Sequence, residues 1–170
     1  MLEFLTVQES CCYDAIVCTW ALMYEQPQKV LNQCQRLLKN GGYLYILVND
    51  QQTLPQIRKI YPKLLIEYVG SINKLMFDLP MPNNAQQLER WAKKAGLKNC
   101  RVTSKKQEFY FTDWNRAAKF VTSTGALAGY DAMLDLKNEK IFNTLVEQLQ
   151  KFFTKPCITH HFVMGIFKKG

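Results

Sequence analysis

The residues best suited to chemistry gather where a short apolar run ends, at Cys18-Thr19-Trp20 and at Tyr24. The run itself, Tyr13 to Cys18, is mostly apolar with β-branched residues at its centre, a composition typical of a strand covered on both faces. Doubly wound sheets bind ligands outside the carboxyl ends of their strands. Trp20 and Tyr24 would put two aromatic rings, each with one polar atom, at such an end. This pattern predicts a pocket with aromatic walls beside the strand.

A helix and a second strand follow, and together with the first strand they form the unit that positions this pocket. The helix has one apolar and one polar face, and Asn40-Gly41-Gly42 is expected to end it, because a glycine just past a helix can adopt the left-handed conformation. Tyr43 to Val48 is the expected second strand. This order predicts a right-handed parallel crossover. The apolar face of the helix consists of Leu31, Cys34, Leu37 and Leu38.

Four short segments of this unit carry a family resemblance: Tyr13-Asp14-Ala15-Ile16-Val17, Ala21-Leu22, Arg36-Leu37-Leu38-Lys39 and Gly41-Gly42. They resemble the middle of a class I S-adenosylmethionine-dependent methyltransferase, in the group that includes trans-aconitate and malonyl-carrier-protein methyltransferases. The resemblance implies an α/β fold with a partial Rossmann-like sheet and flanking helices, whose strands match the fourth to seventh of the family, the last one antiparallel. It also implies S-adenosylmethionine as cofactor and a small-molecule methyl acceptor, for which a carboxylate is one candidate.

The glycine-rich turn that such a cofactor site needs after its first strand is absent from the sequence. Only about a dozen residues precede Tyr13, and the eight glycines include no G-x-G. In the family that loop comes before the part matched here, so the chain resembles the C-terminal half alone. We therefore expect it to be inactive by itself. Whether the short start is biological or arises from gene prediction or splicing stays open.

The resemblance also assigns site residues. Glu3 and Phe4 would hold the adenine, with a frayed terminus as the alternative, while Cys18, Thr19 and Trp20 would border the methionine end of the cofactor. The expected substrate pocket contains Tyr24, Trp114 and His160, and for Trp114 ordinary core packing is an equal alternative. His160 and His161 are adjacent in an expected strand, so their side chains point to opposite faces and cannot bind one metal. No metal site is predicted.

The remaining segments predict alternating helices and strands. Tyr68 to Phe77 could line a substrate region, and Pro62 is expected to end the helix before it. The other expected elements are a helix from Thr53 to Ile60, a helix capped by Asn84 and ended by Gly96, extended chain over 100–104 and 107–111, helices capped by Thr112 and Asn138, and a final strand from Cys157 to Phe167.

Length and composition favour one domain over residues 1–170, with 48% hydrophobic residues. No apolar stretch is long enough to span a membrane and the start lacks the basic region of a signal peptide, so a cytoplasmic protein is expected. The six cysteines show no zinc-site spacing and favour reduced core residues. The net charge of +8 comes from scattered lysine pairs, so nucleic acid is not an expected partner; RNA binding is kept as a third hypothesis.

Strand Asp14 to Cys18 would lack the neighbour that the family places beside it, and an unpaired strand edge attracts another chain. We therefore expect a homo-oligomer or a partner chain that covers this strand. An alternative to the enzyme follows from the same gap: a non-catalytic or degenerate methyltransferase-like module that pairs with another protein.

Overall fold

The fold is known from a computed structural model, which describes residues 1–73, 79–124, 127 and 130–170. The chain divides into two compact units, and each is described by itself. Unit 1 comprises Met1–Thr53, Pro80–Lys106 and His161–Gly170, and unit 2 comprises Leu54–Leu79 and Gln107–His160. The single domain expected from the length stays a prediction.

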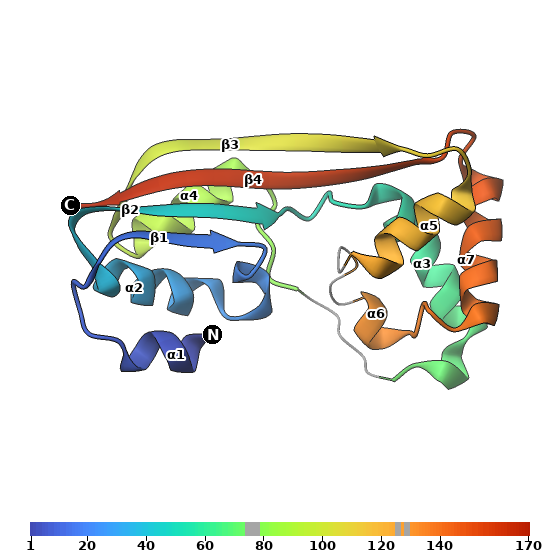
Figure 1. The fold of residues 1–170 in the computed structure, drawn as a ribbon, viewed down its shortest axis with the longest axis horizontal. Helices are drawn as coiled ribbons and strands as arrows, with labels where there is room; N and C mark the ends of the chain where they lie inside the picture. Colours follow the sequence, from blue (N-terminus) through green and yellow to red (C-terminus); the bar gives the residue numbers. More distant parts are fainter. Residues whose placement is uncertain (74–78, 125–126, 128–129) are drawn as a thin grey trace. The chain divides into compact units, whose positions relative to one another are not determined.

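A four-stranded sheet organises the chain (Figure 1). Its strands are β1 (Tyr13–Thr19), β2 (Leu38–Asn49), β3 (Leu97–Tyr110) and β4 (Cys157–Lys169), in the order β1-β2-β4-β3. β1 and β2 run parallel, whereas β4 runs antiparallel to β2. The predicted mixed α/β fold with an antiparallel last strand is therefore confirmed.

Helices cover one face of the sheet in unit 1. They are the short 3-10 helix η1 (Leu22–Tyr24), α2 (Pro27–Leu37) and α4 (Ala85–Lys94), and α2 contacts α4. α1 (Leu2–Val7) packs on α2. Leu44, Ile46 and Val48 of β2 are almost fully buried. Gly165 of β4, which pairs with Ile46, lies so close to α4 that an added Cβ would be 3.3 Å from a methyl group of Leu88. The core of unit 1 therefore lies between this sheet face and the helices.

The opposite face of the sheet is largely uncovered in unit 1. The side chains of Val17, Tyr45 and Met164 are 68%, 40% and 45% exposed, and they come from β1, β2 and β4. Val17 pairs with Tyr45 across the parallel ladder, so these side chains share a face. Among the described residues no strand pairs with the outer edge of β1. We call Val17, Tyr43, Tyr45 and Met164 the bare face.

The beginning of β2 differs from the prediction. α2 ends at Leu37 and β2 begins at Leu38, so Gly41 and Gly42 lie inside a strand and do not cap the helix. Gly41 has a φ of +81°, and a Cβ at Gly42 would lie 2.9 Å from the carbonyl oxygen of Lys39 and 3.0 Å from that of Asp14. The two glycines therefore allow the irregular backbone that β2 adopts where it approaches β1. The pairing of β1 with β2 shifts in register at the same place, between Tyr13 and Ala15.

Unit 2 is built mainly from helices. They are α3 (Pro55–Glu67), the 3-10 helix η2 (Val69–Ser71), α5 (Trp114–Ser123), α6 (Tyr130–Met133) and α7 (Glu139–Phe152). α7 packs against both α3 and α5. A buried cluster that includes Ile57, Leu64, Val121 and Leu145 forms the core of this unit.

Two helix boundaries in unit 2 correct the sequence analysis. Pro62 lies inside α3, which continues to Glu67, because buried Ile60, Tyr61 and Leu64 keep the helix packed on its neighbours despite the missing N–H. Asp113 caps α5 in place of Thr112: its carboxylate accepts a 2.8 Å hydrogen bond from the amide of Arg116. The Asn84, Gly96 and Asn138 signals are confirmed. Part of the expected segment from Tyr68 to Phe77 lies outside the described residues.

Candidate functional site

The chain turns sharply where β1 ends. Trp20 follows Thr19 with a φ of 55°, a left-handed conformation that costs a residue with a side chain about 1–2 kcal/mol. The amide of Trp20 donates a 2.7 Å hydrogen bond to the carbonyl of Leu47 in β2, which holds the turn against the sheet. The ring of Trp20 remains 40% exposed. A strained residue with an exposed aromatic ring at the carboxyl end of a parallel strand is typical of a functional position.

The ring of Trp20 meets Phe162 of β4 edge to face, with centroids 5.9 Å apart. Phe162 pairs with Asn49, the last residue of β2, whose side chain is buried. We call Trp20, Asn49 and Phe162 the aromatic corner. The sequence analysis did not single out Phe162 or Asn49. Successive side chains of a strand point to alternate faces. The same alternation that separates His160 from His161 could have indicated that Phe162 lies on the face opposite His161.

Cys18 is a buried thiol beside the corner. Burial raises the pKa of the Cys18 thiol. The pKa of the Cys34 thiol on α2 is raised to about 12, mainly by burial and further by the nearby Cys18. Both thiols therefore stay protonated at neutral pH. The role implied for Cys18 and for exposed Thr19, a contact with the cofactor through backbone, is compatible with this geometry and stays a prediction.

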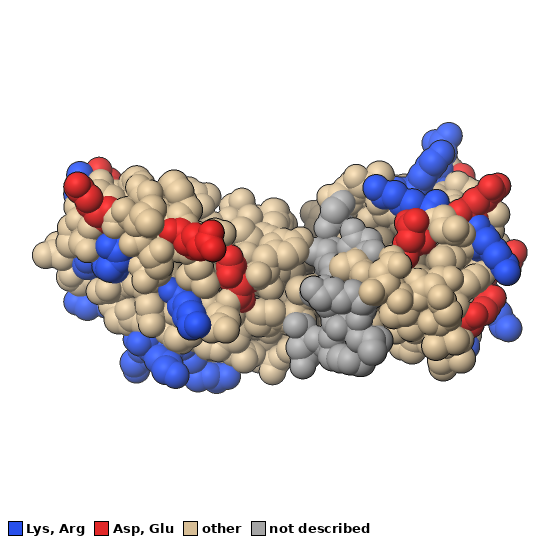
Figure 2. All heavy atoms as spheres, turned by 90° about the horizontal axis from the view of Figure 1, so that it is seen from below, with Lys and Arg blue, Asp and Glu red and all other residues tan. Residues whose placement is uncertain are grey.

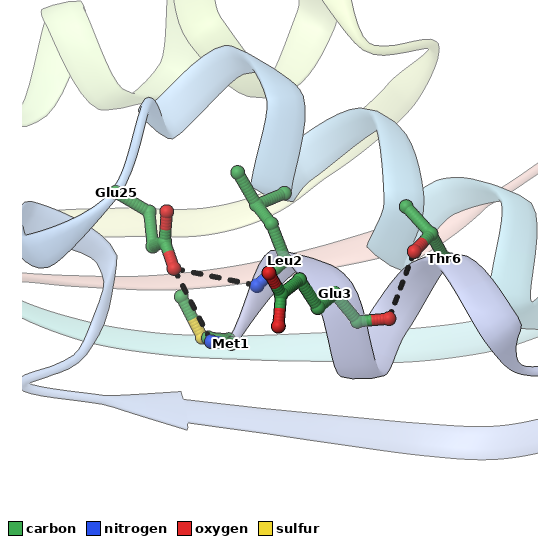
Figure 3. Close-up of polar contacts among 5 residues, drawn as sticks. All are labelled: Met1, Leu2, Glu3, Thr6 and Glu25. Atoms are coloured by element: carbon green, nitrogen blue, oxygen red, sulfur yellow. Dashed lines mark hydrogen bonds and ion pairs between the residues drawn. The ribbon is translucent and has the colours of Figure 1, made fainter.

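Glu25 fastens α1 beside η1 (Figure 3). Its Oε1 accepts hydrogen bonds from the amide of Leu2 at 3.3 Å and from the Met1 ammonium at 3.2 Å. These two bonds lower the pKa of the Glu25 carboxyl. Glu3 and Phe4 lie exposed on α1, and their proposed adenine contact remains a prediction. Sequence reasoning missed Glu25, because no local pattern reveals a contact with a helix more than twenty residues earlier.

Tyr24 lies at the end of η1 and is exposed, in the same unit as Trp20. Trp114 and His160 belong to unit 2, so the structure does not assemble them with Tyr24 into one described site. Trp114 is only 5% exposed, and its indole N–H donates a 3.2 Å hydrogen bond to the carbonyl of Phe153. Burial and a satisfied indole N–H are typical of a core residue, which is the second of the two roles considered for Trp114.

His160 lies edge-on against two phenylalanine rings, Phe109 and Phe120, at centroid distances of 5.7 and 6.5 Å. Its Nε2 is buried and has no hydrogen-bond partner among the described residues. Burial lowers the pKa of His160, so the neutral ring is favoured at physiological pH. A place for His160 in a substrate pocket stays a prediction.

The residues present fit one wall of an S-adenosylmethionine site. An aromatic ring suits a sulfonium cation, and Trp20 lies at the strand end where such a ligand would bind. The Gly41-Gly42 pair lies at the beginning of β2, the opposite end from the aromatic corner. In the described parts of the chain no group of three or more His, Cys, Asp or Glu side chains could hold a metal ion.

Comparison with known proteins gives a family match over part of the chain. Residues 5–46, which span β1, α2 and most of β2, match the methyltransferase domain family. No curated protein sequence matches the chain. In the described part of the chain no helix has both the length and the apolar character needed to cross a bilayer.

Solved structures are similar to this chain at low sequence identity. A protein of Bacillus halodurans C-125 assigned as a methyltransferase is 15% identical with a TM-score of 0.52, covering 96% of this chain and 67% of its own. A Galdieria sulphuraria protein assigned as a sarcosine dimethylglycine methyltransferase is 15% identical (TM-score 0.48), with 98% and 57% covered. The Haemonchus contortus phosphoethanolamine N-methyltransferase 2, solved with S-adenosylhomocysteine, is 15% identical (TM-score 0.46), with 95% and 34% covered. The first of these similarities shows a shared fold.

Proposed function

We propose that this chain is the C-terminal portion of a class I S-adenosylmethionine-dependent methyltransferase that acts on a small molecule. The observation that carries the proposal is the coincidence of two findings on one unit. Residues 5–46 match the methyltransferase domain family, and the strand at the centre of that match ends in the strained, exposed Trp20. We name carboxylic acids as the first class of acceptor to test, and the cytoplasm as the compartment, since all six cysteines are free.

The proposed chemistry asks little of the protein's acids and bases. S-adenosylmethionine supplies a methyl group already activated on a sulfonium, so the protein mainly aligns the acceptor and excludes water. The ring of Trp20, steadied by Phe162, would face the cationic end of the cofactor. Cys18 would contribute backbone, and its raised pKa keeps the thiol a poor nucleophile toward the methyl group.

The second wall of the site must come from a glycine-rich segment. We propose that this segment adds a strand to the outer edge of β1 and covers the bare face. Both surfaces suit this role, because no described strand pairs with the outer edge of β1, and the exposed side chains of Val17 and Tyr45 lie beside that edge.

Methyl transfer by a reconstituted enzyme tests this proposal. The glycine-rich part would be the segment encoded upstream of Met1 if it contains G-x-G, and otherwise the part of the Bacillus halodurans protein that this chain does not cover. Production of S-adenosylhomocysteine is measured against a panel of carboxylic acids, amines and phenols, with the chain alone as control. We expect turnover only when both halves are present. Absence of turnover for every acceptor in a complex shown to bind the cofactor would overturn the enzyme assignment.

A second function, a non-catalytic module that pairs with another protein, is favoured by the same bare face and strand edge. It differs from the first in its use of Trp20. If the chain forms a stable complex with a partner and replacement of Trp20 by alanine changes neither that complex nor any methyl transfer, the module is the better description.

A further inference from the structure

A buried lysine at the end of β4 contacts an exposed cysteine in the turn before β1. Lys169, the last residue of β4, is only 9% exposed although it carries a charge. Its ammonium donates hydrogen bonds to the carbonyl oxygens of Leu38 at 2.8 Å and Arg36 at 3.5 Å, and to the sulfur of Cys11 at 3.5 Å. In Figure 1 the C-terminus accordingly lies beside the beginning of β2. The contact with Cys11 joins residues that are 158 positions apart in the sequence.

The three acceptors of the Lys169 ammonium carry no formal charge while Cys11 is a thiol. Among the described residues no carboxylate lies within ion-pair distance of this ammonium. A buried charge normally has a counter-charge, because burial of a lone charge is costly. Cys11 is the one acceptor of the three that can become an anion, since the other two are backbone carbonyls. A thiolate at this position would therefore supply the missing counter-charge.

Cys11 is also accessible to a reagent, unlike the buried thiols of β1 and α2. Its thiol makes one further contact, a long one of 3.9 Å to the carbonyl oxygen of Arg36. The thiol of the adjacent Cys12 points elsewhere and donates to the carbonyl of Glu9 at 2.9 Å. Cysteines that react with disulfides are exposed and lie beside a cation. Cys11 meets both conditions.

We propose that Cys11 is a modification site for low-molecular-weight disulfides such as glutathione disulfide, with Lys169 as its positioning residue. The Cys11 sulfur attacks one sulfur of the reagent, so that a new S–S bond forms and the old S–S bond breaks. Cys11 is thereby oxidised. The other half of the reagent is reduced and leaves as a thiolate, which takes up the proton that Cys11 loses. The Lys169 ammonium holds the attacking sulfur through its N–H donor.

General attraction between a basic chain and an anionic reagent does not select Cys11. The net charge of +8 attracts such a reagent to the chain as a whole. On the face drawn in Figure 2, the basic side chains occur in separate groups among acidic ones. Selective reaction of Cys11 therefore requires its own contact with Lys169. The site precedes β1, whereas Trp20 follows the end of that strand, so the proposal is independent of the methyltransferase assignment.

Reaction of the full chain with glutathione disulfide, followed by mass spectrometry of its peptides, tests the proposal. Cys100 is the internal reference, because it is also exposed and no lysine or arginine among the described residues donates a hydrogen bond to its sulfur. We expect Cys11 to react about tenfold or more faster than Cys100, since its reaction keeps a hydrogen bond to a charged group. Lys169→Met should remove most of this preference. Lys169→Arg, which keeps the charge and the donors, should retain more of it.

Lys168→Met is the matched control. It removes the same charge one position earlier in the strand, where the ammonium lies 5.5 Å from the centre of the Tyr43 ring, and it should leave the rate of Cys11 unchanged. The buried thiols of Cys18 and Cys34 report on folding in every variant, because a reagent reaches them only when the fold opens. A variant in which they stay unmodified has kept its structure.

Three results would overturn the proposal. One is an equal rate for Cys11 and Cys100 in the unchanged chain, a comparison that needs no variant and decides alone if Lys169→Met does not fold. Another is equal slowing by Lys168→Met and Lys169→Met, which would show general charge attraction. The third is preferential modification of Cys12, which would assign the reactivity to the neighbouring thiol.

Discussion

Trp20 combines strain, exposure and an aromatic partner in a way that core tryptophans do not. Its φ of 55° is one of three positive values at non-glycine residues among the described positions, the others being Cys11 and Leu54. Strain of this kind persists only where the surrounding structure holds it, and the hydrogen bond to Leu47 and the contact with Phe162 do so here. We therefore expect replacement of Trp20 to affect methyl transfer more than it affects the free energy of unfolding.

The paired variants Trp20→Ala and Trp114→Ala test this expectation. Trp114 is buried in unit 2, so its loss should cost about 3–5 kcal/mol and lower the melting temperature by about 10 °C. Trp20 is 40% exposed, so Trp20→Ala should cost about 1–2 kcal/mol, while it should lower methyl transfer in the reconstituted enzyme by about tenfold or more at subsaturating cofactor. Calorimetric melting and the activity assay together decide it. A melting temperature that falls equally in both variants would make Trp20 a core residue.

His160 makes a pH prediction for unit 2. Burial lowers its pKa in the folded state, so the unfolded chain binds a proton more readily as the pH falls below about 6.5. Protonation of His160 therefore does not affect the free energy of unfolding above that pH. Below it, that free energy falls, because the unfolded chain takes up the proton first. We expect His160→Phe, which suits the neighbouring Phe109 and Phe120, to reduce the loss of stability between about pH 7 and pH 5. Urea midpoints at both pH values measure this, and an unchanged slope contradicts it.

Sequence reasoning could locate residues whose neighbours are close along the chain. The caps Asn84 and Asn138 were predicted correctly because a cap is a local signal. The position of Trp20 and Tyr24 just after β1 could also be read from an evident strand, while their roles in a site stay predictions. Phe162 and Glu25 were missed because their partners, Trp20 and Leu2, are distant in sequence. For Trp114, residue type alone left a pocket and ordinary core packing equally open, because a tryptophan suits both; its place in a pocket stays a prediction.

At the scale of elements, the beginning of β2 contains two glycines, Gly41 and Gly42, of the kind that also end helices. Asn40-Gly41-Gly42 is a proper helix stop by local rules. The sheet overrides it, because β2 must pass close to Asp14 of β1, where only glycine fits at position 42. Likewise the packing of α3 overrides Pro62. Tertiary contacts of this kind cannot be read from a local pattern.

Gly42→Ala measures the constraint at this junction. A Cβ would lie 2.9 and 3.0 Å from two backbone oxygens, which cannot move without disturbing β1 or β2, so we expect a loss of about 1–3 kcal/mol. Gly70→Ala is the matched control, because a Cβ there has no neighbour within 4 Å and should be neutral or slightly stabilising. Urea unfolding of both variants gives the comparison. Equal stability of the two would show that the close approach is not maintained in solution.

At the scale of the whole molecule, the part of the sheet in unit 1 has one covered and one bare face, and no strand among the described residues pairs with the outer edge of β1. The antiparallel last strand and the missing neighbour of β1 were expected from the family resemblance, whereas the full strand order was not predicted. The division of the chain into two compact units was not predicted either, because β3 and β4 contribute residues to both and no composition change marks the boundary.

We propose that the isolated chain self-associates through β1 and the bare face. Light scattering after chromatography should give a mass above the 19.8 kDa of one chain. Val17→Lys, which puts a charge at the edge strand where Val17 is 68% exposed, should shift the protein toward monomer. Val69→Lys, at an equally exposed valine in unit 2, should not. A monomeric wild-type chain with a cooperative melt would mean that the edge needs no partner.

The binding of S-adenosylmethionine tests the central claim most directly. Calorimetric titration would be carried out on the chain alone, on the glycine-rich half alone and on the two together, with Trp20→Ala as the variant. The account predicts no binding to either half by itself, binding at a stoichiometry of about one in the mixture, and weakening of about tenfold or more when Trp20 is replaced. Binding by the glycine-rich half alone that is unaffected by this chain, or no binding in the mixture, would contradict it.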